Sequence, residues 1–129
     1  MWLSEQSAAI RRSGDAPEVA AVTIPGSSPA ARVGSERRGL TVMAPGGYVW
    51  IPGRDAEVLT VECATGETAV SGQRMDAPPA GMQPGEVYLH SSGGASVLLR
   101  ASGKIEIRGS VEITGGLTVN GLPVQLSGG

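Results

Sequence analysis

Hydrophobic and polar residues alternate along the last third of the chain, in short runs that end at turns containing glycine. A period of two is typical of a β-strand with one apolar and one polar face. The aliphatic positions of this pattern are Val87, Leu89, Val97, Leu99, Ile105, Ile107, Val111, Ile113, Leu117 and Val119. The opposite positions include Glu86, Tyr88, His90, Arg100, Glu106, Arg108 and Glu112. The pattern predicts a series of short β-steps over residues 85–121, with one slim aliphatic face.

A second region with the same period covers residues 18–75, where Pro and Gly mark the turns. Its β-rich runs predict five short strands, at residues 19–24, 40–43, 48–51, 56–63 and 67–71. Residues 25–39 are rich in Gly, Ser, Pro and Arg, which predicts a loop. Five short strands suit a small barrel or sandwich, and an OB-like barrel is the smallest fold with that count.

Three segments lie outside these two regions. Residues 1–17 form an N-terminal arm that is helix-compatible over residues 2–12, or flexible, because Leu3 and Ile10 share a helical face and Ser4 is a suitable cap. Residues 76–84 are rich in Pro and Gly and predict a linker between the two β regions. Residues 122–129 form the C-terminal tip.

The composition leaves little material for a core within one chain. The 129 residues include no Phe, two Trp, two Tyr and 20 Gly, so large core-filling side chains are scarce. A lone ribbon of short strands is marginal in water, and its edges leave backbone N–H and C=O groups unpaired. Three copies around an axis bury the aliphatic faces in one column and pair the edges between chains, which favours a homotrimer. A monomeric β-sandwich, with these strands as its second sheet, is the alternative.

Charge and cysteine content exclude several classes of protein. The net charge is −2 and Lys104 is the single lysine, so the chain lacks the basic footprint of a nucleic-acid binder. Cys63 is alone, which leaves no intramolecular disulfide. No run approaches the roughly 20 apolar residues of a membrane helix. The first residues lack the basic start and apolar core of a signal peptide, so we expect synthesis in the host cytoplasm.

Two stretches resemble a known family. Residues 85–107, from Gly85-Glu86 through Lys104-Ile105-Glu106-Ile107, resemble the spike proteins of contractile phage baseplates, the Mu-like and baseplate-assembly-protein-V families, which are related in architecture to the spikes of type VI secretion. Residues 48–59 resemble the part of the OB barrel in which a Pro and Gly segment leads through Glu57-Val58 into a central strand. The resemblance covers residues from about 18 to 121, and its 85–121 part is the more specific.

The resemblance implies an all-β homotrimer, in which an OB-like collar is followed by an intertwined triple-stranded β-helix. It implies a place at the tail tip of a virion or an equivalent particle, where the spike closes the tail tube and pierces the cell envelope. The implied partners are the tail tube or hub, baseplate proteins and a separate tip protein. Some relatives hold an iron ion through a terminal His-x-His pair, but His90 is the only histidine here, so no metal is expected.

Two other classes of function compete with a structural role. A hydrolase that uses two carboxylates could take them from Asp55, Glu57, Glu62 and Glu67. These acidic residues are better explained as solvent-exposed side chains on strand faces and turns. No nucleophile–base pair or phosphate-binding motif is present, so we expect neither an enzyme nor a bound cofactor. The alternative function is an OB-like module that binds a sugar or an oligonucleotide, with Tyr48 and Trp50 as the stacking rings.

Overall fold

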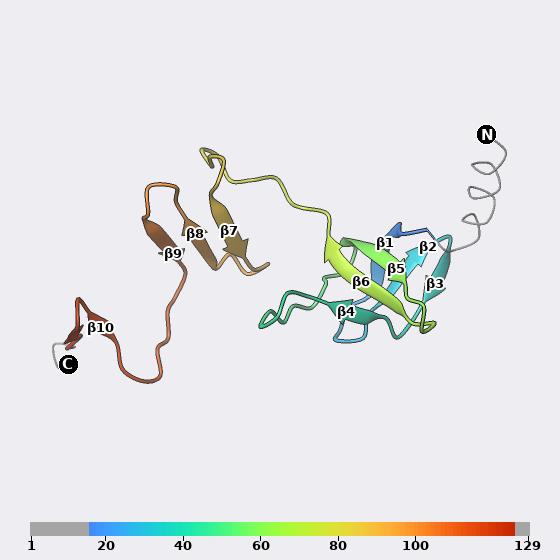
Figure 1. The fold of residues 1–129 in the computed structure, drawn as a ribbon, viewed down its shortest axis with the longest axis horizontal. Helices are drawn as coiled ribbons and strands as arrows, with labels where there is room; N and C mark the ends of the chain where they lie inside the picture. The colour runs from blue at the N-terminus through green and yellow to red at the C-terminus, as the bar shows by residue number, and fades with distance from the viewer. Residues whose placement is uncertain (1–15, 126–129) are drawn as a thin grey trace. The chain divides into compact units, whose positions relative to one another are not determined.

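The computed structural model describes residues 16–125, and in that range the chain is all-β, with eleven strands and no helix. The chain divides between Asp76 and Ala77 into two compact units (Figure 1). Most of the arm predicted over residues 1–17, including its helix-compatible stretch, lies outside the described residues. So do the last four residues of the tip predicted over residues 122–129.

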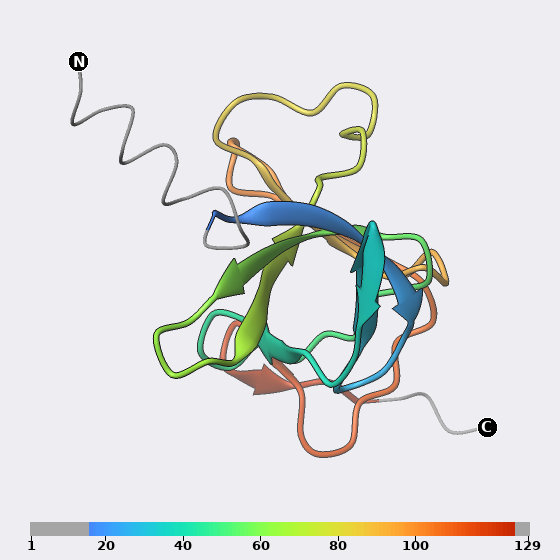
Figure 2. The ribbon, with the colours of Figure 1, turned by 90° about the vertical axis from the view of Figure 1, so that its right-hand side faces the viewer.

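The first unit is one six-stranded sheet in the order β3-β2-β1-β5-β6-β4. Figure 2 shows that this sheet curls strongly around its inner face. Its pairs are antiparallel except that of β4 with β6, and its hydrogen-bonded order stays open, with β3 and β4 as edges. The strands are β1 (Glu18–Ile24), β2 (Ala30–Val33), β3 (Ser35–Arg37), β4 (Thr41–Met43), β5 (Glu57–Glu62) and β6 (Thr68–Gln73).

Small aliphatic side chains form the core of the curled sheet. Val22, Val58 and Val70 are the largest of the fully buried apolar chains, and Ala20 lies directly opposite Val58 across the β1–β5 pair. Trp50 packs against this cluster from the loop after β4. Burial of each valine contributes roughly 1.5–3 kcal/mol to stability. The core is small, because few side chains are fully buried and none of them is large.

The strand predictions for this unit are partly wrong. Residues 30–37, predicted as loop, form β2 and β3, where Ala30 and Ala31 are buried against the core side. Residues 48–51 were predicted as a strand, but they belong to no strand. Trp50 packs against the core and Pro52 is fully buried, which holds this segment away from the sheet. The sheet therefore has six strands rather than five, and its open order replaces the closed barrel that was expected.

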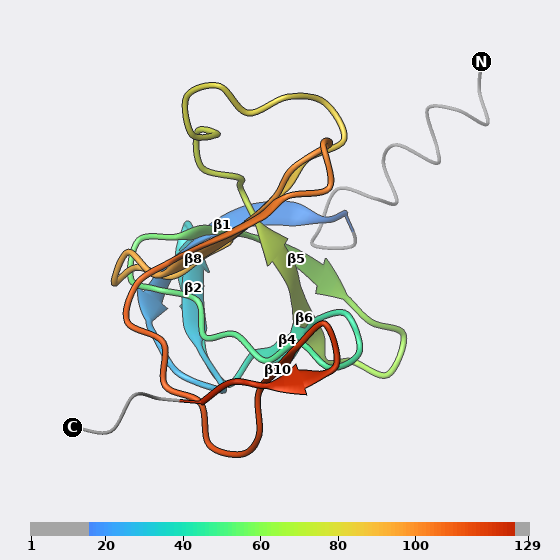
Figure 3. The ribbon, with the colours of Figure 1, turned by 90° about the vertical axis from the view of Figure 1, so that its left-hand side faces the viewer.

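The second unit contains a three-stranded antiparallel sheet in the order β7-β8-β9. Its strands are β7 (Val87–His90), β8 (Ser96–Leu99) and β9 (Ile105–Arg108). A two-stranded ribbon follows, β10 (Thr118–Val119) with β11 (Leu122–Pro123), drawn in red in Figure 3. The β-steps predicted over residues 85–121 are partly wrong, since the segment from Val111 to Thr114 forms no strand.

The two turns of the three-stranded sheet have the same construction. The Ser91 amide donates to the Ala95 carbonyl and the Gly94 amide to the Ser91 carbonyl, at 3.0 and 3.1 Å. The Arg100 amide donates to Lys104 and the Gly103 amide to Arg100, at 2.9 and 3.0 Å. Gly94 and Gly103 have φ of 92° and 93°, a left-handed conformation that glycine adopts at low cost. Such turns fix the register of the strands that they join.

Candidate self-association face

Strand register brings six of the predicted trimer-core residues onto one side of the β7-β8-β9 sheet. Val87 lies opposite Leu99, which lies opposite Ile105, and these three form one row. Leu89, Val97 and Ile107 form a second row in the same way. Side chains opposite each other across an antiparallel pair are in contact range. The self-association face is defined here as Val87, Leu89, Val97, Leu99, Ile105 and Ile107.

These side chains are left largely uncovered within one copy. Five of the six are between 39 and 61% exposed, and Val97, in the central strand, is half-buried. A contiguous exposed aliphatic patch marks an interaction surface in a soluble protein. The face carries no charged or polar side chain that would hold ordered water, so what it can do chemically is pack against another apolar surface.

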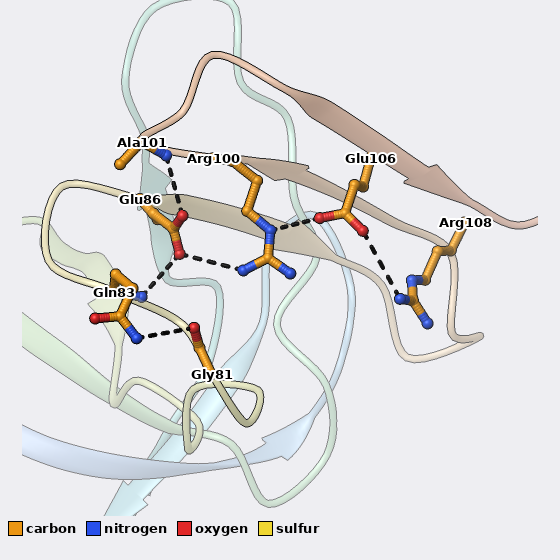
Figure 4. A network of polar contacts seen from close by, with 7 residues as sticks. All are labelled: Gly81, Gln83, Glu86, Arg100, Ala101, Glu106 and Arg108. Atoms are coloured by element: carbon orange, nitrogen blue, oxygen red, sulfur yellow. Dashed lines mark hydrogen bonds and ion pairs between the residues drawn. The ribbon is translucent and has the colours of Figure 1, made fainter.

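The reverse side of the sheet is held by a chain of charges, which Figure 4 shows end to end. The Glu86 carboxylate accepts hydrogen bonds from the backbone amides of Gln83 (2.8 Å) and Ala101 (3.0 Å) and lies 3.4 Å from the Arg100 guanidinium. Arg100 also binds Glu106, and Arg108 lies 3.9 Å from the other oxygen of Glu106. The charges alternate in sign, so the chain of contacts neutralises itself.

This network fixes where the linker enters the sheet. The Glu86 side chain is only 5% exposed. It joins the segment before β7 to the turn between β8 and β9. The two backbone amides, followed by Arg100, hold the pKa of Glu86 below its usual value. The hydrogen bond from Arg100 does the same for the pKa of Glu106, and that bond raises the pKa of Arg100 in turn.

The alternation of the sequence contains a signal for this network that the prediction did not use. The sequence pattern places Glu86, Arg100 and Glu106 together on the polar face, without pairing them. Glu86 directly precedes β7, Arg100 directly follows β8 and Glu106 lies in β9, so their opposite signs indicate pairing. Leu98 and Ser96, on the same side, are buried beneath this polar layer.

The other four predicted trimer-core residues lie beyond the sheet. Val111, Ile113 and Leu117 belong to no strand and Val119 lies in β10, and all four are exposed. The first three help to line a hollow of about 400 Å³, together with Gly115, Gly116, Pro123 and Val124. The Val124 amide donates to the Leu117 carbonyl at 2.8 Å and closes this loop. Apolar side chains therefore continue from the sheet to the end of the described chain.

Residues considered for other chemistry are placed apart. Trp50 packs on the core while Tyr48 is exposed. His90 stacks on Tyr88 with ring centroids 5.0 Å apart, and Cys63 is a free, half-buried thiol. Across residues 16–125, no three His, Cys, Asp or Glu side chains are grouped so that they could hold a metal ion. In the same range, no helix has the length and apolar character needed to cross a membrane.

No protein-family model and no curated protein matches the chain. The fold and the site define a broad class of protein. The described residues form an all-β protein, and its second unit presents an uncovered aliphatic face.

Proposed function

We propose that this chain is a structural protein, the trimeric spike at the centre of the baseplate of a phage or phage-like contractile particle. In this role it closes the tail tube and pierces the envelope of the target cell. The observation that carries the proposal is the self-association face, which is apolar, exposed in one copy and backed by a self-neutralised network of charges.

Three copies give this face a partner. Around a three-fold axis, the two rows of Val, Leu and Ile meet their symmetry mates in a dry column, and the apolar positions of residues 111–119 extend that column. Branched and unbranched aliphatic chains suit such a column because three side chains must share each layer. The second unit thereby becomes an intertwined triple-stranded β-helix, and the curled first unit an OB-like collar at its base.

A piercing role requires stiffness and shape rather than a reactive group. The described residues offer stiffness, in a short β-sheet that hydrogen bonds and ion pairs of Glu86 and Arg100 hold together. We infer that the protein is not an enzyme and works without a cofactor or nucleic acid. Its partners in this role are two further copies, the tail tube or hub, baseplate proteins and a tip protein, and its location is the tail tip of the particle.

Oligomeric state tests the proposal through a matched pair of variants. Ile105→Asp places a charge in the column, and Lys104→Asp places the same side chain at the preceding, exposed position. Light scattering after size exclusion should give a trimer for the parent protein and Lys104→Asp, and a monomer for Ile105→Asp.

The expected loss of the trimer has a physical reason, because burying an unpaired carboxylate is costly enough to prevent assembly. Ile105 is exposed in one copy, so its variant should keep its β circular-dichroism spectrum. A monomeric parent, or a trimeric Ile105→Asp, contradicts the proposal.

A further inference from the structure

The loop between β4 and β5 presents a second uncovered apolar surface. Figure 1 shows this loop extending out past the end of β4. Residues 40–53 contain no charged side chain. Tyr48, Val49 and Ile51 are exposed, and Val49 is 96% exposed, the highest value among the large apolar residues described. Nothing within residues 16–125 covers these side chains.

This loop is held in place rather than loose. Trp50 packs against the core cluster, Pro52 is fully buried, and the Tyr48 amide donates to the Pro45 carbonyl at 3.0 Å. Because Trp50 points to the core, its neighbours Val49 and Ile51 are left on the outside. An anchored segment loses little further freedom when a partner binds it.

The backbone of the loop from Val49 to Ile51 has no partner among the described residues, since no backbone hydrogen bond or strand pairing involves these three residues. Tyr, Val, Trp and Ile are residues with high β propensity. The segment thus has the composition of a strand and the free N–H and C=O groups of a strand, without a neighbouring strand.

A free sheet edge exists in the same unit. Among the described residues, β4 ends the sheet order and pairs with β6 alone, so its other edge is open from Thr41 onward. The amide of the preceding Leu40 donates to the Pro29 carbonyl at 3.0 Å. Natural sheets protect an open edge with charges or proline, yet β4 (Thr41–Met43) carries neither, and Met43 is exposed. By contrast β3, the other edge, carries Glu36 and Arg37.

We propose that Tyr48–Ile51 of one copy adds as a strand to the open β4 edge of a neighbouring copy. The donor segment and the acceptor edge are different surfaces of one chain, so the contact is heterologous, and three such contacts close a ring. Neither segment carries a charged side chain of its own, so no like charges oppose the contact. The inference rests on the proposed trimer and adds a second contact to it, at the collar. Peptide addition to a sheet edge is a common mode of recognition.

Disulfide trapping between two single-cysteine variants tests the contact. Met43→Cys, carrying an affinity tag, and untagged Val49→Cys are co-expressed as full-length chains in a Cys63→Ser background and oxidised. A disulfide between a tagged and an untagged chain must be intermolecular. Strand addition raises the effective concentration of the two thiols to the order of mM, so we expect at least about 10-fold more mixed dimer than in the control. The control replaces Met43→Cys with Met75→Cys, another exposed methionine outside β4.

The outcomes separate this contact from the spike proposal. Mixed dimers with Met43→Cys that exceed those with Met75→Cys support strand addition. Trimers by light scattering with no excess of mixed dimers overturn strand addition and leave the spike trimer standing. Monomers throughout overturn both. An excess of tagged-with-tagged dimers overturns it as well, because it indicates a symmetric contact between β4 edges.

Discussion

Glu86 links three parts of the second unit through its carboxylate. Its nearly buried carboxylate accepts hydrogen bonds from Gln83 and Ala101, two segments that are distant along the chain, and it faces Arg100. An apolar face on one side of a three-stranded sheet gives that sheet no core of its own. In a single copy, the hydrogen bonds and ion pairs on the polar side therefore stabilise the arrangement of the three strands.

Acid should weaken this part of the molecule. The pKa of Glu86 is lower in the folded chain than in the unfolded chain. Its contribution to stability is therefore complete above the ordinary glutamate pKa, about 4.3, and is lost as pH falls through the lower, folded value. Glu106 acts in the same direction. We expect the hydrogen-exchange protection factor of the Ala101 amide to fall at such low pH.

Glu86→Gln is the control for that pH dependence. The amide keeps one acceptor oxygen but cannot titrate, so Ala101 protection should be lower at neutral pH and change less on acidification. Global unfolding is a weaker readout, because the Thr23 hydroxyl, followed by Arg38, lowers the pKa of Glu36 in the first unit and gives acid sensitivity of the same sign. An Ala101 protection factor that is independent of pH in the parent protein contradicts this role for Glu86.

At the scale of the element, the turns decide the register of the self-association face. Gly94 and Gly103 occupy the same position in two turns of the same construction. A shift of one residue in either turn would move the aliphatic side chains to the charged side of the sheet.

Gly103→Ala should destabilise the second unit by about 1 kcal/mol. No atom lies within 4 Å of an added Cβ, so the cost comes from the left-handed backbone alone. Gly93→Ala is the matched control, since Gly93 lacks a positive φ and its added Cβ would meet only the Ser91 hydroxyl, at 3.7 Å. Denaturant unfolding of both variants measures the difference, and equal stabilities would show that the turn does not constrain the register.

The elements that could be predicted are those in which local pattern and final packing agree. β7, β8 and β9 lie where the alternation over residues 85–121 predicts short strands, because alternation and glycine turns act locally there. β2 and β3 were missed because Ala30 and Ala31 are small core residues within a stretch of turn-forming composition. Tyr48–Ile51 has the propensity of a strand, but the burial of Trp50 and Pro52 prevents pairing with β4.

At the scale of the whole molecule, many large aliphatic side chains of residues 16–125 are exposed in a single copy. The fully buried apolar chains are small, while the self-association face and the residues from Val111 to Val119 are exposed. The sequence predicted that six aliphatic side chains share one face of the β7-β8-β9 sheet, because that follows from a period of two, but it did not predict the irregular path of residues 109–117. It did not predict the charge network behind them, since pairing of Glu86 with Ala101 requires the tertiary arrangement of the turn.

Stability should therefore depend on protein concentration. For a trimer that unfolds to monomers, a hundredfold increase in concentration adds about 1.8 kcal/mol per protomer, by mass action. This corresponds to a rise in Tm of about 7 °C for a chain of this length. Calorimetry over that concentration range measures it. A Tm that does not change with concentration favours the monomeric β-sandwich instead.

The glycine turns also let strand pairing within one chain precede association between chains. Each pairing in the β7-β8-β9 sheet joins strands that are neighbours in sequence, and hairpins of this kind close in about 1–10 μs. Encounter between chains is slower and depends on how many chains are present. In the proposed trimer, each chain would therefore present a formed aliphatic face before a second copy binds, and assembly would compete with non-specific association through that face.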